Sequence, residues 1–133
     1  MKRPWAIGAL AILLACFHDS AAPIPDEVHG RFLLRTIDGK PLPQVYADLP
    51  NFRLEFISGR IVLHEDGSFA DSTELRRTES GLVRRVIDVA EGTFVQAGDT
   101  IKLESTRGEH YFMIFANPNL TQNLGGRLLV YRR

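Results

Sequence analysis

Several features that define large classes of protein are scarce in this sequence of 133 residues. It holds one cysteine, Cys16, so no disulfide within the chain can stabilise the fold. Basic and acidic residues are balanced at 16 each, and removal of Lys2 and Arg3 leaves 14 basic against 16 acidic residues. So small a net charge gives no long-range field that attracts a polyanion. The composition therefore excludes a disulfide scaffold and argues against nucleic acid as a partner.

Long hydrophobic runs are also absent, apart from one near the N-terminus. Met1–Pro4 is a short basic segment, and Trp5–Phe17 contains no charged residue. A mature transmembrane helix needs about 20 apolar residues, whereas a run of this length is typical of the apolar centre of a secretion signal. The pattern predicts that the chain is exported.

The end of that run contains Leu13-Leu14-Ala15-Cys16, which resembles the lipobox of bacterial lipoproteins. The resemblance implies a signal peptide over residues 1–15, lipidation of Cys16 with a tether over residues 16–27, and one domain over residues 28–133. It also implies a lipid anchor in the bacterial cell envelope, with the outer membrane, facing the periplasm, as the expected location. The alternative is cleavage after Ala22, with Cys16 an ordinary residue of the signal.

From Val28 onward, apolar and polar residues alternate in short segments, and helical periodicity is scarce. The alternation is clear over 30–35, 52–56 and 101–103, and turns that contain glycine separate such segments. With no crossover helix between them, they predict an all-β fold, an antiparallel meander of about seven or eight strands closed into a small barrel.

Two segments depart from this alternation. Lys40–Asn51 contains Pro41, Pro43 and Pro50, which predicts one long loop lying over a barrel end as a lid or plug. Tyr111–Ala116 is apolar throughout and rich in aromatic residues, so it predicts a strand covered on both faces.

Several turn-and-strand segments resemble the small lipocalin-like lipoproteins of bacterial envelopes. They are Gly30–Leu34, Ile37–Pro43, Gly59–Leu63, Asp66–Phe69, Gly92–Phe94, Gly98–Leu103 and Leu129–Arg133. Lipocalins proper carry Gly-x-Trp in the first strand, and here Gly30-Arg31-Phe32 places phenylalanine at the aromatic position. The resemblance implies a lipocalin-like barrel but identifies no ligand, because one fold hosts many functions.

Motifs of catalytic sites are missing from the sequence. No Gly-x-Ser-x-Gly segment is present, and the single thiol of Cys16 is assigned to the lipid. His29, His64 and His110 lack the spacings that identify a metal site, and solvated surface histidines are the simpler interpretation. We therefore expect no catalytic residue, no metal and no cofactor.

Two arginine doublets, Arg76-Arg77 and Arg84-Arg85, flank the turn at Ser80-Gly81 of a predicted hairpin. Because strand side chains alternate between faces, each doublet places one arginine on each face. Two arginines that share the inner face need a counter-charge from a ligand or from the chain. The acidic candidates within the chain are Glu74, Glu79 and Asp88.

We interpret Arg77 and Arg85 as the inner pair, which clasps a carboxylate or phosphate headgroup at the barrel mouth. Four aromatic side chains are then expected to line an apolar interior: Phe32, Phe56, Phe94 and Phe115. The simpler interpretations are that the arginines are solvated at the rim and that the rings fill the interior without a cavity.

Two functions remain open. The favoured one is a membrane-tethered, non-catalytic module that binds a small apolar or acyl ligand inside the barrel. The other is a structural or interaction lipoprotein with a filled barrel, which presents the long loop and Tyr131-Arg132-Arg133 to an envelope protein. An internal cavity favours the first function, whereas a packed interior and an exposed patch favour the second.

Overall fold

The computed structural model describes residues 27–133, so the predicted signal peptide and Cys16 lie outside the described residues. The described chain consists of strands joined by turns. They are β1 (Gly30–Ile37), β2 (Lys40–Pro41), β3 (Gln44–Leu49), β4 (Phe52–Leu63), β5 (Ser68–Glu79), β6 (Leu82–Ala97), β7 (Thr100–Ser105), β8 (His110–Ala116), β9 (Asn119–Leu124) and β10 (Arg127–Arg132). Within residues 27–133 no helix is long and apolar enough to cross a membrane.

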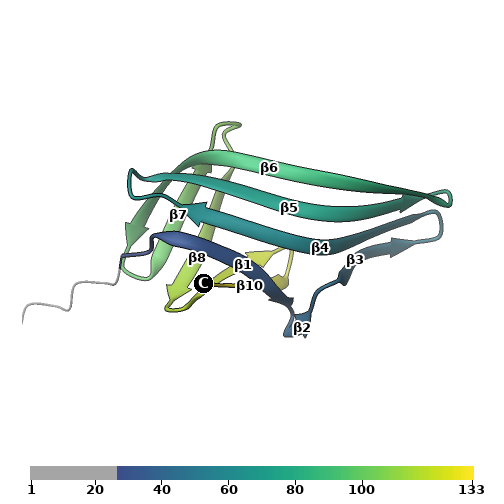
Figure 1. Cartoon of the computed structure of the whole chain (residues 1–133), viewed down its shortest axis with the longest axis horizontal. Helices are drawn as coiled ribbons and strands as arrows, with labels where there is room; N and C mark the ends of the chain where they lie inside the picture. The colour runs from purple at the N-terminus through teal and green to yellow at the C-terminus, as the bar shows by residue number, and fades with distance from the viewer. Residues whose placement is uncertain (1–26) are drawn as a thin grey trace, which may run out of the picture.

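Eight of these strands form a closed antiparallel barrel, which confirms the predicted fold class (Figure 1). Strands β4 to β10 pair in chain order. Strand β1 closes the barrel because its first half pairs with β4, from Gly30 opposite Leu63 to Leu33 opposite Arg60, while its second half pairs with β10. Closure leaves the barrel strands without exposed edges over the length that they share.

The predicted long loop over 40–51 is wrong, because most of this segment forms strands. Strand β2 pairs with the end of β1, and β3 adds to the sheet beside the first half of β4. The three prolines lie at Pro41, Pro43 and Pro50, which leaves Gln44–Leu49 with all of its backbone N–H donors. Proline is tolerated at strand ends for that reason, and the segment extends the sheet instead of plugging the barrel.

Strands β4, β5 and β6 are longer than the barrel needs, and their distal parts project from one end of it with β3 alongside (Figure 1). We call this projection the flap. It consists of β3, residues 52–56 of β4, 75–79 of β5 and 82–87 of β6. Strand β7 pairs with β6 only from Gly92 to Ala97, so the flap portion of β6 has a neighbouring strand on one side only.

Apolar side chains that point inward fill most of the barrel. The buried set comprises Val28, Phe32, Leu34, Ile37, Phe56, Ile61, Leu63, Phe69, Phe94, Ile101, Leu103, Met113, Phe115, Leu120, Leu129 and Tyr131. At the end where the described chain begins, Val28 is fully buried and the guanidinium of Arg133 lies 5.1 Å from the centre of the Phe32 ring. That end of the barrel is therefore closed.

Strand β8 is covered on one face only, so the prediction of a strand covered on both faces is wrong. Met113 and Phe115 point into the core, whereas Phe112 is 58% exposed and Ile114 is 43% exposed. Val95 of β6 is also exposed on this side of the barrel, with Lys102 of β7 between it and Phe112. The run is apolar because its outer residues form a surface patch, a pattern that the sequence cannot distinguish from burial on both sides.

Candidate functional site

The barrel is open at the end beneath the flap, where a pocket of about 250 Å³ extends into the interior. Its apolar wall is formed mainly by Phe56, Leu75, Leu124 and Leu129. The polar groups that line it are Asp71 and Thr73 of β5, Asp88 of β6, Arg107 and Glu109 of the β7–β8 turn, Tyr111 of β8, Gln122 of β9 and Tyr131 of β10. We call this feature the mouth pocket.

Two polar atoms in the mouth pocket have no hydrogen-bond partner among the described residues. They are Oδ1 of Asp71 and the hydroxyl of Tyr111, and both atoms are buried. A buried polar group without a partner costs free energy, so native proteins keep few of them. Both atoms line the same pocket, which makes them the strongest indication that a ligand belongs there.

Electrostatics set these groups apart from the other acids of the chain. Burial, together with the nearby carboxylate of Asp88, raises the pKa of Asp71 from its ordinary value of 3.8 to about 6. Burial also raises the pKa of Tyr111 and of Tyr131, and the charge of Asp71 adds to both effects. Groups with perturbed pKa values that converge in a cleft are typical of functional sites.

The charge around the pocket is mainly negative. Three carboxylates line it, from Asp71, Asp88 and Glu109, against one guanidinium, from Arg107. Nη2 of Arg107 lies 3.9 Å from Oδ1 of Asp88 and 3.7 Å from Oε2 of Glu109. Both ion pairs are exposed to water, so neither contributes much to the stability of the fold. The pocket therefore favours a ligand that donates hydrogen bonds or carries positive charge.

The four predicted aromatic residues divide between core and pocket. Phe32 and Phe115 pack edge to face with ring centres 6.1 Å apart, and Phe94 is buried near the closed end beside His29. Phe56 alone of the four lines the mouth pocket, where the ring of Tyr46 from β3 packs against it at 5.3 Å. The structure thus brings one predicted ring to the site and places three in the packed interior.

The pairing of Arg77 with Arg85 on one face is wrong. The hairpin register places Arg77 opposite Arg84, on the face that continues the barrel interior, and Arg76 opposite Arg85 on the outer face. Each doublet does divide between the two faces, but a hairpin with a two-residue turn at Ser80-Gly81 brings the nearer members of the doublets together.

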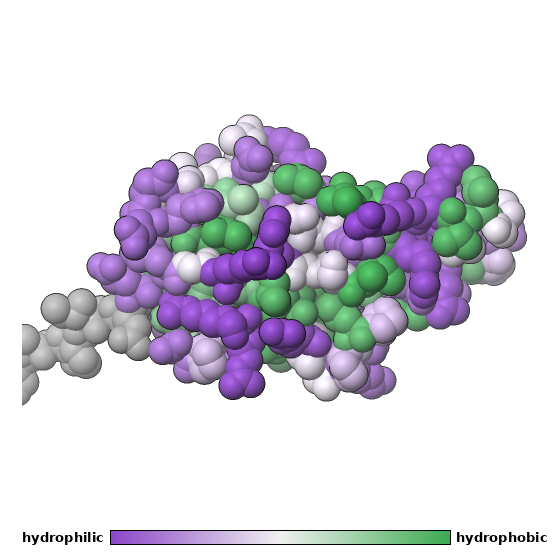
Figure 2. All heavy atoms as spheres, in the orientation of Figure 1, coloured by the Kyte–Doolittle hydropathy of each residue, from purple (hydrophilic) through white to green (hydrophobic). Residues whose placement is uncertain are grey.

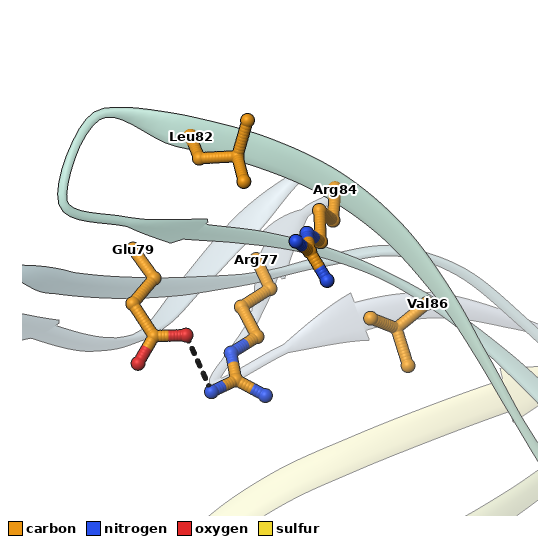
Figure 3. Close-up of a pocket in the computed structure, with 5 residues that line it drawn as sticks. All are labelled: Arg77, Glu79, Leu82, Arg84 and Val86. Atoms are coloured by element: carbon orange, nitrogen blue, oxygen red, sulfur yellow. Dashed lines mark hydrogen bonds and ion pairs between the residues drawn. The ribbon is translucent and has the colours of Figure 1, made fainter.

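Ion pairs within the chain occupy most of these arginines. On the outer face Arg85 donates two hydrogen bonds to Glu74, with Nε to Oε1 at 2.6 Å and Nη2 to Oε2 at 3.0 Å. On the inner face Arg77 and Arg84 border an open hollow of about 390 Å³ near the flap tip, and Arg77 bonds Glu79 (Figure 3). The hollow is larger than the mouth pocket, but its side chains are largely exposed to water. Water satisfies their polar groups, so the hollow is the weaker candidate.

The remaining predicted residues do not converge. Among residues 27–133, no three histidine, cysteine or acidic side chains lie close enough together to hold a metal ion. Tyr131, predicted to be displayed to a partner, is only 2% exposed and belongs to the core and the pocket wall.

Sequence reasoning missed the acidic and tyrosine residues of the mouth pocket, although β5 contains a signal for one of them. Phe69, Asp71 and Leu75 lie an even number of residues apart, so a carboxylate shares the face of two apolar side chains. An acid on the buried face of an alternating strand is unusual enough to suggest a site. Tyr111 and Tyr131 carried no such signal, because tyrosine is common in barrel cores.

The buried carboxyl group predicts a pH dependence of stability. Because the folded state raises the pKa of Asp71 from 3.8 to about 6, its ionisation destabilises the fold as pH rises from about 4 to 6, and the loss persists above that range. Asp71→Asn should therefore be more stable than the wild type at pH 8 by about 2–3 kcal/mol and about equal to it below pH 4. Urea unfolding across this pH range measures the difference, and a difference independent of pH would contradict the assignment.

No family model matches this chain, and no curated protein matches it either. The functional argument therefore starts from the geometry of the mouth pocket.

Proposed function

We propose that this protein is a lipid-anchored, non-catalytic binding module of the bacterial cell envelope, and that its mouth pocket takes one small amphipathic molecule. The observation that carries the proposal is the pair of buried polar atoms, Asp71 Oδ1 and the Tyr111 hydroxyl, that share one pocket without a partner among the described residues. A ligand that donates an N–H or O–H to the carboxylate satisfies its hydrogen-bonding requirement, and an ammonium group also balances its charge.

The apolar wall of the pocket supports an alkyl or acyl body for this ligand. Phe56, Leu75 and Leu129 line the same pocket as its polar groups, and apolar surfaces with a few polar groups are typical of small-molecule sites. A pocket of about 250 Å³ suits a short chain and is too small for a whole phospholipid. The anchor rests on the lipobox-like sequence that ends at Cys16, outside the described residues.

One observation favours the second function, an interaction lipoprotein that acts on an envelope protein. The half of the barrel around Phe32 and Phe115 is packed, so no ligand enters there. The exposed apolar side chains of Phe112 and Ile114 on the outer face of β8 provide a surface on which such a protein could dock. A mouth pocket that binds no small molecule would leave this function as the better one.

Three ligands that differ only in their head group test the proposal. Octylamine, octanol and octanoate are titrated into the purified full chain at pH 7.5 by isothermal titration calorimetry. We expect octylamine to bind most tightly and octanoate most weakly, because the pocket carries excess negative charge. Asp71→Asn should weaken octylamine binding by about tenfold or more, since a hydrogen bond to a charged group contributes about 1.5–3 kcal/mol.

A matched variant separates the site from general charge effects. Asp99→Asn removes one carboxylate from the exposed turn between β6 and β7 and should leave the octylamine affinity unchanged. Absence of binding by all three ligands, or equal binding by the wild type and Asp71→Asn, would overturn the proposal.

A further inference from the structure

The flap portion of β6 is an open sheet edge with unusual exposure of apolar side chains. Its inner residue Leu82 is 54% exposed, and its outer residues Val83 and Ile87 are 58% and 53% exposed. Hydrophobic residues lie along this upper edge of the molecule in Figure 2. Long, apolar, unpaired edge strands readily pair with another strand.

Backbone groups along this edge point away from β5. Glu91 accepts a hydrogen bond from Thr106 N at 2.8 Å through its carbonyl, and the carbonyl of Val89 accepts one from Arg107 at 3.2 Å. The register between β5 and β6 is continuous, so every second residue directs its N–H and C=O to the same side. Arg85 and Ile87 therefore offer their backbone groups to an incoming strand.

Arg84 also lacks a counter-charge. It faces Arg77 across the hairpin, and within the described residues no carboxylate forms an ion pair with it, whereas Arg77 bonds Glu79 (Figure 3). Like charges that face each other on neighbouring strands are unfavourable. Four residues further along β6, on the same face, Asp88 is 65% exposed and holds only the distant contact with Arg107.

We propose that β6 pairs edge to edge with β6 of a second copy of this chain, antiparallel and with the two-fold axis at Val86. A two-fold axis perpendicular to the sheet keeps the inner faces of both copies on one side. Residues that lie opposite each other must then point to the same face, so the axis lies between the two copies of one residue. With the axis at Val86, Arg84 of each copy lies opposite Asp88 of the other. Arg85 lies opposite Ile87, and these two residues exchange backbone hydrogen bonds.

Neighbouring registers lack this complementarity. An axis at Arg85 places the two Arg85 side chains opposite each other, which is a like-charge contact. An axis at Ile87 places Arg84 opposite Ala90, without any charge partner. With the axis at Val86, each Arg84 gains the Asp88 of the other copy as its counter-charge. The pairing also brings the exposed apolar side chains of the two edges together. The result is one continuous sheet that joins the two flaps, and the contact reaches the rim of each mouth pocket at Asp88.

Single cysteines determine both the pairing and its register. Val86→Cys, Arg85→Cys and Ile87→Cys are each made in a full chain that also carries Cys16→Ala, so that the introduced thiol is the only one. Under mild oxidation we expect a covalent dimer from Val86→Cys alone, because only residues at the axis approach within disulfide distance. Cross-linking of Arg85→Cys or Ile87→Cys instead would overturn the register, and absence of any cross-link would overturn the pairing.

Charge reversal tests the role of Arg84 and Asp88. Sedimentation velocity of the full chain over a concentration series should show a reversible dimer. Arg84→Asp or Asp88→Arg alone should raise its dissociation constant by about tenfold or more, because both symmetric ion pairs become like-charge contacts. The double variant Arg84→Asp/Asp88→Arg should restore the dimer.

Two further readouts separate pairing from folding. Arg84→Asp places a carboxylate opposite Arg77, so its thermal stability as a monomer should not fall even though the dimer is lost. Arg60→Asp, an exposed charge reversal on β4 of the barrel, should leave the dimer intact. A monomeric wild type at all concentrations, or a double variant that fails to dimerise, would overturn the proposal and leave the edge to another kind of partner.

Discussion

Phe32→Ala is expected to lower the free energy of unfolding by about 3–5 kcal/mol. The Phe32 side chain is fully buried near the closed end of the barrel, in contact with the edge of the Phe115 ring and beneath the guanidinium of Arg133. Alanine at this position leaves a cavity, because strands on all sides prevent the neighbours from collapsing into the space. Urea unfolding at pH 7 measures the loss.

A second phenylalanine in the same barrel provides the control. Phe112 is 58% exposed on the outer face of β8, so Phe112→Ala should change the free energy of unfolding by no more than about 0.5 kcal/mol. The contrast tests whether the interior near the closed end is packed. A small effect of Phe32→Ala would mean that this half of the barrel is hollow, and a ligand site along Phe32 would then be favoured.

Gly92→Ala should be almost as damaging, with a loss of about 3 kcal/mol. Gly92 is paired with Ser105 at the end of β7, and an added Cβ would lie less than 3.0 Å from backbone atoms of Glu104 and Ser105. Backbone cannot move aside as a side chain can, so the two strands must separate and their hydrogen bonds must lengthen. For a domain of this size the midpoint of thermal unfolding should fall by roughly 10 °C or more.

Another glycine of the same strand pair serves as the comparison. Gly98, in the turn between β6 and β7, has a φ of 65° and no heavy atom within 4 Å of an added Cβ. Gly98→Asn should therefore cost little, because asparagine tolerates the left-handed conformation. Circular dichroism melts of both variants give the comparison, and similar midpoints would contradict the close approach of the two backbones at Gly92.

Much of the fold could be predicted because strands and turns are local properties of the chain. The alternation around Phe32 and Phe56 specifies strands with one buried face, and Ser80-Gly81 specifies a hairpin turn. The prediction failed where a pattern permits two structures. Prolines on both sides of Gln44–Leu49 suggested a loop, yet they leave enough free N–H groups for an added strand.

The sequence by itself determined that the chain is all-β, that a barrel of about eight strands results, and that each arginine doublet divides between the two faces of a hairpin. These properties depend on residues near one another in the chain. Tertiary structure decided which arginines share a face, that most of the interior is packed, and that Asp71, Tyr111 and Tyr131 meet at one open end. The three residues of the site come from β5, β8 and β10. These strands are far apart in the chain, so the three residues meet only if every pair of strands between them has the right register. No local sequence pattern specifies all of these registers together.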